Sequence, residues 1–344
     1  MRRSIIFTCF SMTAGVFAAI SCSSGDSDSG CPEGTVLCAD GRCYGNGVPC
    51  PEAVGGTGGG TGLGGGPSSS GGQTSATGGA PVSGSDGGII IPDAEPVSAT
   101  CPDAARGSGT FTNAYDGRFV NVVNSDKQYY LATNWWSLGT QAPPTVRWDG
   151  LSFSLSNMGS GTTSNAPIGY PSLFIGHYQG HRTAGSNLPK RVGDINRIPT
   201  ALLSNATQGA SANYNVAYDV WFTDGGELTA GATAPPAQGA FLMVWLFDPS
   251  GRQPRGSNRR PGATISGVPG SWDVWVDSTQ PPCISYVSTS FRNSLEFDLN
   301  HFIRDGVSNG YLNDNMDLAV IFGGTEVWNG GEGLSIDGFC AIVE

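Results

Sequence analysis

From about residue 97 to residue 344, short runs of aromatic and β-branched residues alternate with clusters of Gly, Pro, Asn and Asp. Such short, recurring runs predict an all-β fold, an antiparallel β-sandwich or barrel. In one stretch Leu295, Leu299, Phe302 and Ile303 recur at helical spacing, which predicts one short helix over 295–307. The predicted strand segments are 129–136, 145–156, 172–178, 214–222, 241–247, 271–277, 283–289 and 317–323.

Alternation within two of these strands assigns their side chains to two faces. In 214–222 one face is apolar and is predicted to join the core, whereas the other mixes a carboxylate with an indole and suits a solvated groove. In 241–247 both faces are bulky, which predicts a central strand covered on each side. The groove-facing residues of the first strand are Asn215, Ala217, Asp219 and Trp221, and the second strand places Leu242, Val244 and Leu246 opposite Phe241, Met243, Trp245 and Phe247.

The tryptophans suggest what such a groove could bind. Sugar rings present flat apolar faces that aromatic side chains cover, while polar groups bind the hydroxyls. A single Trp in a β-sandwich is more often a core residue, but the set, placed beside Asn134 and Asp219, predicts a sugar-binding groove. The candidate platforms are Trp135, Trp136, Trp221, Trp245, Trp275 and Trp328.

The charge balance narrows the choice of partner. The chain carries a net charge of −11, and charged side chains make up only 13% of it. Binding to nucleic acid or to an anionic membrane surface needs clustered Lys and Arg, so an acidic chain favours a neutral polymer such as a polysaccharide. We expect a monomer without a cofactor. We also expect no metal site, because His177 and His181 are four residues apart but lie on a predicted strand and a Gly turn and not on a helix.

The N-terminal residues predict export. Arg2 and Arg3 precede a mostly apolar run that is too short and too polar to span a bilayer, which predicts a signal peptide over residues 1–21. The Ala-Ile-Ser sequence before Cys22 resembles a bacterial lipobox without its usual Leu, and predicts cleavage there and lipidation of Cys22. Simple secretion is the alternative. Either way we expect a protein of the bacterial cell surface, the outer membrane or the extracellular medium, where disulfides can form.

Composition divides the rest of the N-terminal region into three segments. These are a spacer over 22–30, a Cys-rich module over 31–53 and a Gly/Ser-rich linker over 54–96 that is too poor in apolar residues to form a core. The module predicts two disulfides in one of three connectivities, with a zinc site as the weaker alternative because no CxxC pair is present. Its cysteines are Cys31, Cys38, Cys43 and Cys50, whereas Cys283 and Cys340 are expected to pair with each other or one of them with Cys101.

Several segments, in order along the C-terminal half, resemble glycoside hydrolase family 12, the compact jelly-roll endoglucanases and xyloglucanases. Residues 169–176 are similar to the family's Tyr-Pro strand, 186–200 to the stretch that follows, and 215–222 to its Ala-Tyr-Asp strand. Residues 241–246 resemble its Glu-Leu-Met-Ile-Trp-Leu strand, 322–330 its Phe-Gly-Thr-Glu-Pro-Phe motif and, more loosely, 133–136 its Asn-Asn-x-Trp segment. The resemblance implies a jelly-roll sandwich over 97–344 that acts on β-1,4-glucan or xyloglucan.

The resemblance also implies roles for individual residues. Glu326 falls on the family's general acid/base, and Asp219 on the carboxylate that hydrogen-bonds the nucleophile. The substrate-binding positions implied by the family or by the aromatic pattern are Asn134, Trp136, Trp221, Met243 and Trp245.

The main departure from the family is at the nucleophile, where this chain has Phe241 in place of Glu. A phenyl ring cannot form the covalent glycosyl ester of a retaining mechanism, and Glu227 lies upstream in a Gly-rich loop. Two hypotheses follow. In the first the chain is a hydrolase that uses Asp219 and Glu326 by a modified route; in the second it is a glucan-binding surface lectin that does not cut. A structural cell-surface domain without a sugar ligand is the third and weakest alternative.

Overall fold

The structure, a computed structural model, describes residues 35–37, 43–45, 107–162, 165–207, 213–249 and 251–344. The predicted signal peptide, Cys22, Cys101 and the linker lie outside these residues. Residues 33–95 form a unit of their own, in which an antiparallel pair, β1 (Thr35–Leu37) and β2 (Cys43–Gly45), is described.

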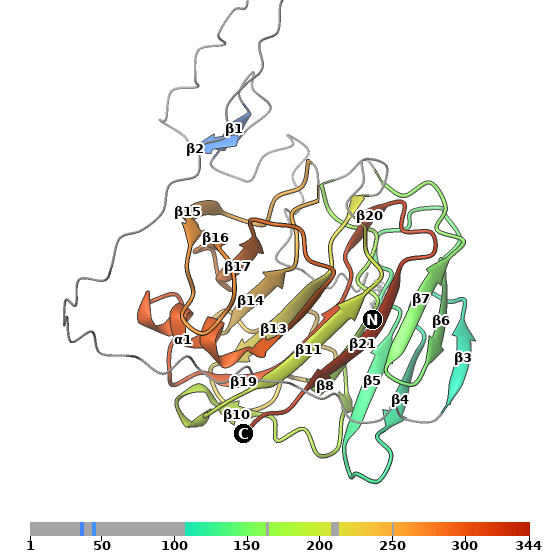
Figure 1. The fold of residues 1–344 in the computed structure, drawn as a ribbon, viewed down its shortest axis with the longest axis horizontal. Helices are drawn as coiled ribbons and strands as arrows, with labels where there is room; N and C mark the ends of the chain where they lie inside the picture. Colours follow the sequence, from blue (N-terminus) through green and yellow to red (C-terminus); the bar gives the residue numbers. More distant parts are fainter. Residues whose placement is uncertain (1–34, 38–42, 46–106, 163–164, 208–212, 250) are drawn as a thin grey trace, which may run out of the picture. The chain divides into compact units, whose positions relative to one another are not determined.

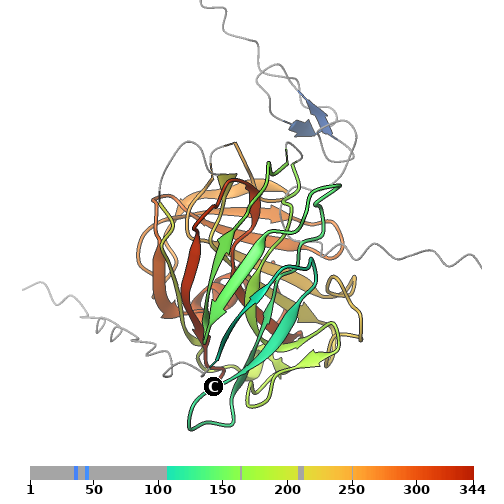
Figure 2. The same ribbon diagram turned by 90° about the vertical axis from the view of Figure 1, so that its right-hand side faces the viewer.

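The large unit is a two-layer β-sandwich, as the alternating pattern predicted (Figures 1 and 2). The larger sheet runs in the order β15 (Ser257–Ala263), β16 (Trp272–Asp277), β17 (Cys283–Ser288), β14 (Ala240–Trp245), β13 (Ala217–Thr223), β19 (Asp317–Gly324), β8 (Ser172–Tyr178), β5 (Gln128–Ala132) and β4 (Gly117–Asn121). Two short strands add to it, β9 (His181–Arg182) beside β8 and β10 (Lys190–Arg191) beside β19. Among the paired strands that the structure describes, β14 and β17 alone run parallel.

The smaller sheet covers one face of the larger one. Its order is β18 (Ser294–Asp298), β11 (Pro199–Ser204), β21 (Ser335–Ala341), β7 (Ser152–Ser156), β6 (Thr145–Asp149) and β3 (Ser108–Phe111). A further pair, β12 (Asn213–Tyr214) with β20 (Val327–Asn329), and a 3-10 turn at Val192–Asp194 complete the described strands and turns. The apolar core between the two sheets includes Val216, Tyr218 and Val220, as alternation in 214–222 predicted.

The second apolar cluster lies on the other face of the larger sheet, which we call the outer face. Its members come from the larger sheet, from β20 and from loops, and none comes from the smaller sheet. Ala217, Trp221, Phe241, Met243 and Trp245 lie on this face, so β14 is covered on both sides, as the sequence predicted. A face that carries this many aromatic side chains opposite the core is the place where a ligand could bind.

The one α-helix of the described residues, α1 (Asn300–Ser308), is shorter than predicted. Residues 294–298 form β18 instead, because Leu295 and Phe297 alternate toward the core and pair with β11. Asp298 then ends the strand, since its Oδ1 accepts hydrogen bonds from the backbone N–H groups of Ile198 and Asn300. No helix among the described residues is long and apolar enough to cross a membrane.

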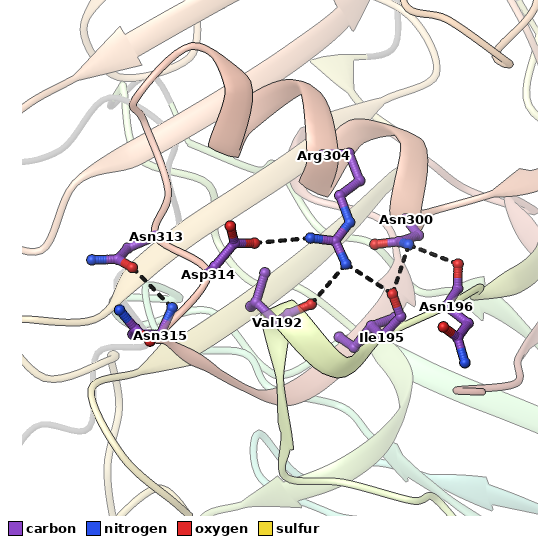
Figure 3. A network of polar contacts seen from close by, with 8 residues as sticks. All are labelled: Val192, Ile195, Asn196, Asn300, Arg304, Asn313, Asp314 and Asn315. Atoms are coloured by element: carbon purple, nitrogen blue, oxygen red, sulfur yellow. Dashed lines mark hydrogen bonds and ion pairs between the residues drawn. The ribbon is translucent and has the colours of Figure 1, made fainter.

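A polar network holds α1 to the loops beside it (Figure 3). Arg304 donates to Asp314 Oδ1 at 2.8 Å and to the carbonyl oxygens of Val192 and Ile195 at 3.1 and 2.9 Å. Asn300 Nδ2 donates to the carbonyl oxygens of Ile195 and Asn196 at 3.1 and 2.9 Å. These bonds satisfy loop carbonyls that no strand partner reaches, and so fix the loop over 192–196 against the helix.

Two further expectations need correction. The strand predicted over 129–136 ends at Ala132, and residues 133–136 turn away from the sheet, with Asn134 at a positive φ of 50°. The turn sends the ring of Trp135 into the core between the sheets, so Trp135 is not a sugar platform.

Cys283 and Cys340, which the sequence analysis expects to form disulfides, are both disulfide-bonded.

Candidate active site

Asp219 lies near the middle of the outer face. On β13 it is directly opposite Met243 of β14 on one side and Phe322 of β19 on the other. Alternation places Ala217 and Trp221 on the same face, two residues before and after it. The strands therefore hold a single carboxylate among apolar and aromatic side chains.

The Asp219 carboxylate is almost completely buried, with 3% of its surface exposed. Its Oδ2 accepts a hydrogen bond from Trp221 Nε1 at 2.8 Å, whereas its Oδ1 has no hydrogen-bond partner among the described residues. Burial raises the pKa of Asp219 to about 8, against the lowering by the Trp221 hydrogen bond, and the nearby Glu326 raises the pKa further. The fold thus keeps a costly group at this position and leaves one of its oxygens unused.

Glu326 lies between β19 and β20 and is fully buried. Asn215, in the gap between β12 and β13, holds it with both ends of its amide. Its Nδ2 donates to Glu326 Oε2 at 2.7 Å, and its Oδ1 accepts from the backbone N–H of Glu326 at 3.0 Å. The Asn215 N–H also donates to the Glu326 carbonyl at 3.0 Å. Three bonds from one residue fix both the backbone and the carboxyl group of Glu326.

Phe241 fills the position at which the family resemblance implies a nucleophile. It is fully buried on β14 and lies directly opposite Trp221, with the two ring centroids 5.4 Å apart. No residue of β14 carries a carboxylate, because the strand reads Ala-Phe-Leu-Met-Val-Trp. The candidate carboxylates are therefore Asp219 on β13 and Glu326 between β19 and β20, and β14 offers none.

A small cavity adjoins Asp219 on the outer face. Its volume is about 10 Å³, and Asp219 is the one acid among the residues that line it. Three predicted binding residues, Asn134, Trp136 and Trp221, line it, whereas Met243 and Trp245 are on the same face but outside the lining. The complete lining is Asn134, Trp136, Tyr170, Tyr178, Asp219, Trp221 and Phe322.

The other predicted platforms also lie on the outer face. Trp328 packs against Trp245, with ring centroids 6.1 Å apart, and Trp275 is partly buried beside the same cluster. His177 lies 3.4 Å from a carboxylate oxygen of Glu227, which also forms an ion pair with Arg182. Among the residues that the structure describes, no group of His, Cys, Asp and Glu could hold a metal ion.

The sequence analysis missed three residues of this site. Alternation predicted a face for Asn215 but not its contact with Glu326, which spans 111 positions of sequence. Tyr170 donates to the carbonyl oxygen of Ala217 at 2.8 Å, and Tyr178 packs on Trp221 and Phe322 with ring centroids 5.2 and 5.1 Å apart. Tyr170 belongs to the segment 169–176 that resembles the family's Tyr-Pro strand, and Tyr178 ends the predicted strand over 172–178, so these were the available signals.

Comparison with known proteins agrees with the family resemblance found in the sequence. Residues 127–344 match the family model described as Glycosyl hydrolase family 12. A probable cellulase of Mycobacterium tuberculosis is 30% identical over 161 residues, which cover 46% of this chain and 99% of that protein. Endoglucanase S of Pectobacterium parmentieri is 27% identical over 223 residues, which cover 60% of this chain and 78% of that protein.

Solved structures extend the comparison to the fold. An endoglucanase of Rhodothermus marinus has a TM-score of 0.58 and 28% identity, covering 69% of this chain and 99% of that one. A metagenome-derived endoglucanase of the same family has a TM-score of 0.59 and 26% identity, covering 70% and 99%. The family match covers more than half of the chain and includes both carboxylates, and the two-layer sandwich is the fold of these relatives. The chain is therefore a glycoside hydrolase that belongs to glycosyl hydrolase family 12.

Proposed function

We propose that this protein is an endo-acting hydrolase that cleaves internal bonds of β-1,4-glucan or xyloglucan. Glu326 is the general acid and Asp219 is the second carboxylate. The observation that carries this proposal is that two buried carboxyl groups, Asp219 and Glu326, lie close enough for Glu326 to raise the pKa of Asp219, at positions where burial of a carboxylate is costly. Glycoside hydrolysis needs two carboxyl groups across the scissile bond. The named relatives support the substrate class, since they include a cellulase, an endoglucanase and a probable xyloglucan-specific endo-β-1,4-glucanase of Aspergillus terreus.

Glu326 suits the role of acid because its position does not depend on substrate. The bonds from Asn215 hold its carboxyl group in one place before a sugar arrives, and a proton donor works best when it is held in the geometry of the transition state. Asp219 suits the role of base because one of its oxygens has no partner among the described residues.

The proposal includes export, which the sequence alone supports. A glucan polymer cannot enter a bacterial cell intact, so a hydrolase of this kind acts outside the cytoplasm. The signal peptide over 1–21 and lipidation at Cys22 would hold the catalytic domain at the cell surface by the linker over 54–96.

The second candidate function is glucan binding without hydrolysis, and Phe241 is the observation that favours it. Without a carboxylate on β14 the retaining route is closed. The aromatic side chains of the outer face could still cover sugar rings. A protein of this kind would bind glucan and leave its length unchanged.

Release of reducing ends separates the two functions. The full chain is incubated with xyloglucan, mixed-linkage glucan and carboxymethylcellulose beside its Glu326→Gln and Asp219→Asn variants. We expect product from the parent and at least 10²-fold less from each variant, because each loses one acid–base group. Glu296→Gln is the matched control, since Glu296 lies in β18 of the smaller sheet, away from the outer face.

The binding function is decided in the same experiment. A folded parent that retains glucan on an affinity gel but releases no reducing ends would overturn hydrolysis and establish the lectin. Equal product from the parent and Glu326→Gln would reject Glu326 as the acid.

A further inference from the structure

The cavity beside Asp219 is the feature that the proposed function leaves unexplained. Its volume of about 10 Å³ lies at the lower limit for one ordered water molecule and is far too small for a sugar ring. Two of its lining residues each carry a buried polar atom without a hydrogen-bond partner among the described residues, namely Asp219 Oδ1 and Tyr178 Oη. A buried polar atom that is left unpaired destabilises the folded state, so both atoms gain from a hydrogen-bond partner.

These two atoms are complementary partners for one water. A carboxylate oxygen accepts a hydrogen bond from the water, and a phenol can donate to the water's oxygen. The hydroxyl of Tyr178 is deeply buried, and the neighbouring Asp219 helps burial to raise its pKa, so it stays protonated and able to donate. The Trp221 bond to Oδ2 fixes the orientation of the carboxylate and leaves Oδ1 for the water.

We infer that this cavity holds the water that attacks the anomeric carbon, with Asp219 as the base that takes its proton and Tyr178 as the residue that positions it. The inference rests on the proposed function and deepens it. Its consequence is that hydrolysis inverts the configuration at the anomeric carbon. An attack by water also accounts for Phe241, because this route needs no carboxylate on β14.

The chemistry of the step balances without any further reactant. The water oxygen forms a bond to the anomeric carbon while the glycosidic bond breaks, and the bonding electron pair leaves with the glycosidic oxygen. Asp219 takes one proton from the water, and Glu326 gives one proton to the leaving oxygen. The two carboxyl groups then return to their starting protonation states by exchange with solvent.

The raised pKa of Asp219 fits the role of base. A carboxylate with a pKa of about 8 is a stronger base than an exposed aspartate. It is also protonated below that pH, so the fraction of Asp219 in the basic form, and with it the rate, should rise with pH up to about 8.

The first test is the anomer of the fresh product, followed by ¹H NMR during hydrolysis of a soluble glucan by the full chain. The inference expects the α-anomer first, with the β-anomer growing only by mutarotation. The β-anomer as first product would overturn the inference and leave the proposed function intact. Absence of any product would overturn both, and the assay of reducing ends would identify that case.

The second test is the water itself and the residue that positions it. A high-resolution crystal structure of the parent is expected to show one water within hydrogen-bond distance of Asp219 Oδ1 and Tyr178 Oη. Tyr178→Phe should lose this water and about 10-fold or more in kcat with little change in KM. Tyr311→Phe, which removes a phenol beside α1, is the matched control. A dry cavity in the parent, or full activity in Tyr178→Phe, would contradict the inference.

A variant of the base covers the case in which Tyr178→Phe fails to fold. Asp219→Ala is inactive on an aryl β-cellobioside in the inferred mechanism, and azide should rescue it by taking the place of the water. Because azide needs no base, the expected product is the α-glycosyl azide. A β-glycosyl azide would show attack from the opposite face and would reject the inference.

Discussion

The network around α1 and the outer face of the larger sheet differ in how many of their buried polar groups are hydrogen-bonded within the protein. Around α1, Arg304 and Asn300 together give five hydrogen bonds to loop carbonyls and to Asp314 (Figure 3). In that network only Asn300 Oδ1 is buried without a partner. The network holds loops in place, and almost every donor in it is used within the protein.

The outer face leaves its polar groups open. Four buried atoms there have no partner among the described residues, namely Ser172 Oγ, Tyr178 Oη, Asp219 Oδ1 and Trp245 Nε1. Since each unpaired group weakens the fold, a protein that keeps four of them on one face has a use for them. The difference is that the α1 network uses its donors within the protein, whereas the outer face leaves unpaired the groups that the proposed function needs for water and sugar hydroxyls.

The largest expected change comes from adding a carboxylate to the outer face. Phe241→Glu restores an acid at the family's nucleophile position and opens a covalent route. We expect hydrolysis to rise by about 10²-fold and the first product to switch from the α- to the β-anomer. The assay combines reducing ends with NMR, and Phe241→Gln is the control for loss of the ring. An unchanged anomer would mean that position 241 does not face the anomeric carbon.

Breaking the satisfied network should affect stability and not chemistry. Arg304→Ala removes three hydrogen bonds to the loops and should cost about 2 kcal/mol, which lowers Tm by roughly 4–8 °C. Thermal unfolding followed by circular dichroism measures this. The control is Arg197→Ala, since Arg197 is half exposed and lies 3.9 Å from Asp298, a pair worth less than about 1 kcal/mol. A loss of kcat at 25 °C in Arg304→Ala would contradict the division between the two regions.

A smaller effect on kcat is expected at Asn215, whose side chain hydrogen-bonds the proposed acid Glu326. Asn215→Ala removes the Nδ2 hydrogen bond that helps to orient the Glu326 carboxyl group, so kcat should fall by about 10-fold with little change in KM. Steady-state kinetics on xyloglucan gives this split. Asn205→Ala is the control, because Asn205 directly follows β11 of the smaller sheet and its amide donates to the carbonyl oxygen of Gly333. Equal losses in both variants would point to a general effect on folding.

Much of this arrangement could be predicted from sequence. Alternation in 214–222 placed Asp219 and Trp221 on one face and Tyr218 in the core, because a strand with one bulky apolar face has only one stable register. The two carboxylates followed from motif resemblance. The helix was predicted too long because Leu295 satisfies both a helical and a strand period, and pairing with Leu202 of β11 decided for the strand.

The contacts that make the site could not be predicted. Asn215 and Glu326 are far apart in sequence, and their hydrogen bonds depend on the packing of β12 against β20. Trp135 and Trp136 are adjacent residues of the same type, so the sequence does not distinguish them. The turn at Asn134 sends the ring of Trp135 to the core, whereas Trp136 lines the cavity. That Asp219 Oδ1 and Tyr178 Oη are unpaired can be seen only from the positions of all their neighbours in the folded structure.

The most direct test of the account is the stability and the activity of Asp219→Asn, measured together from pH 4 to pH 8. The pKa of Asp219 is raised in the folded chain to about 8, above its unfolded value of about 3.9. Ionisation is therefore favoured in the unfolded state, and the stability of the parent falls as pH rises from about 4 to 8. Asparagine carries no charge and removes this loss. The account predicts that Asp219→Asn unfolds at a higher temperature than the parent at pH 8, with a smaller difference at pH 4, while hydrolysis falls at least 10²-fold. A variant that is less stable than the parent at pH 8, or that still hydrolyses glucan at the parent's rate, would contradict it.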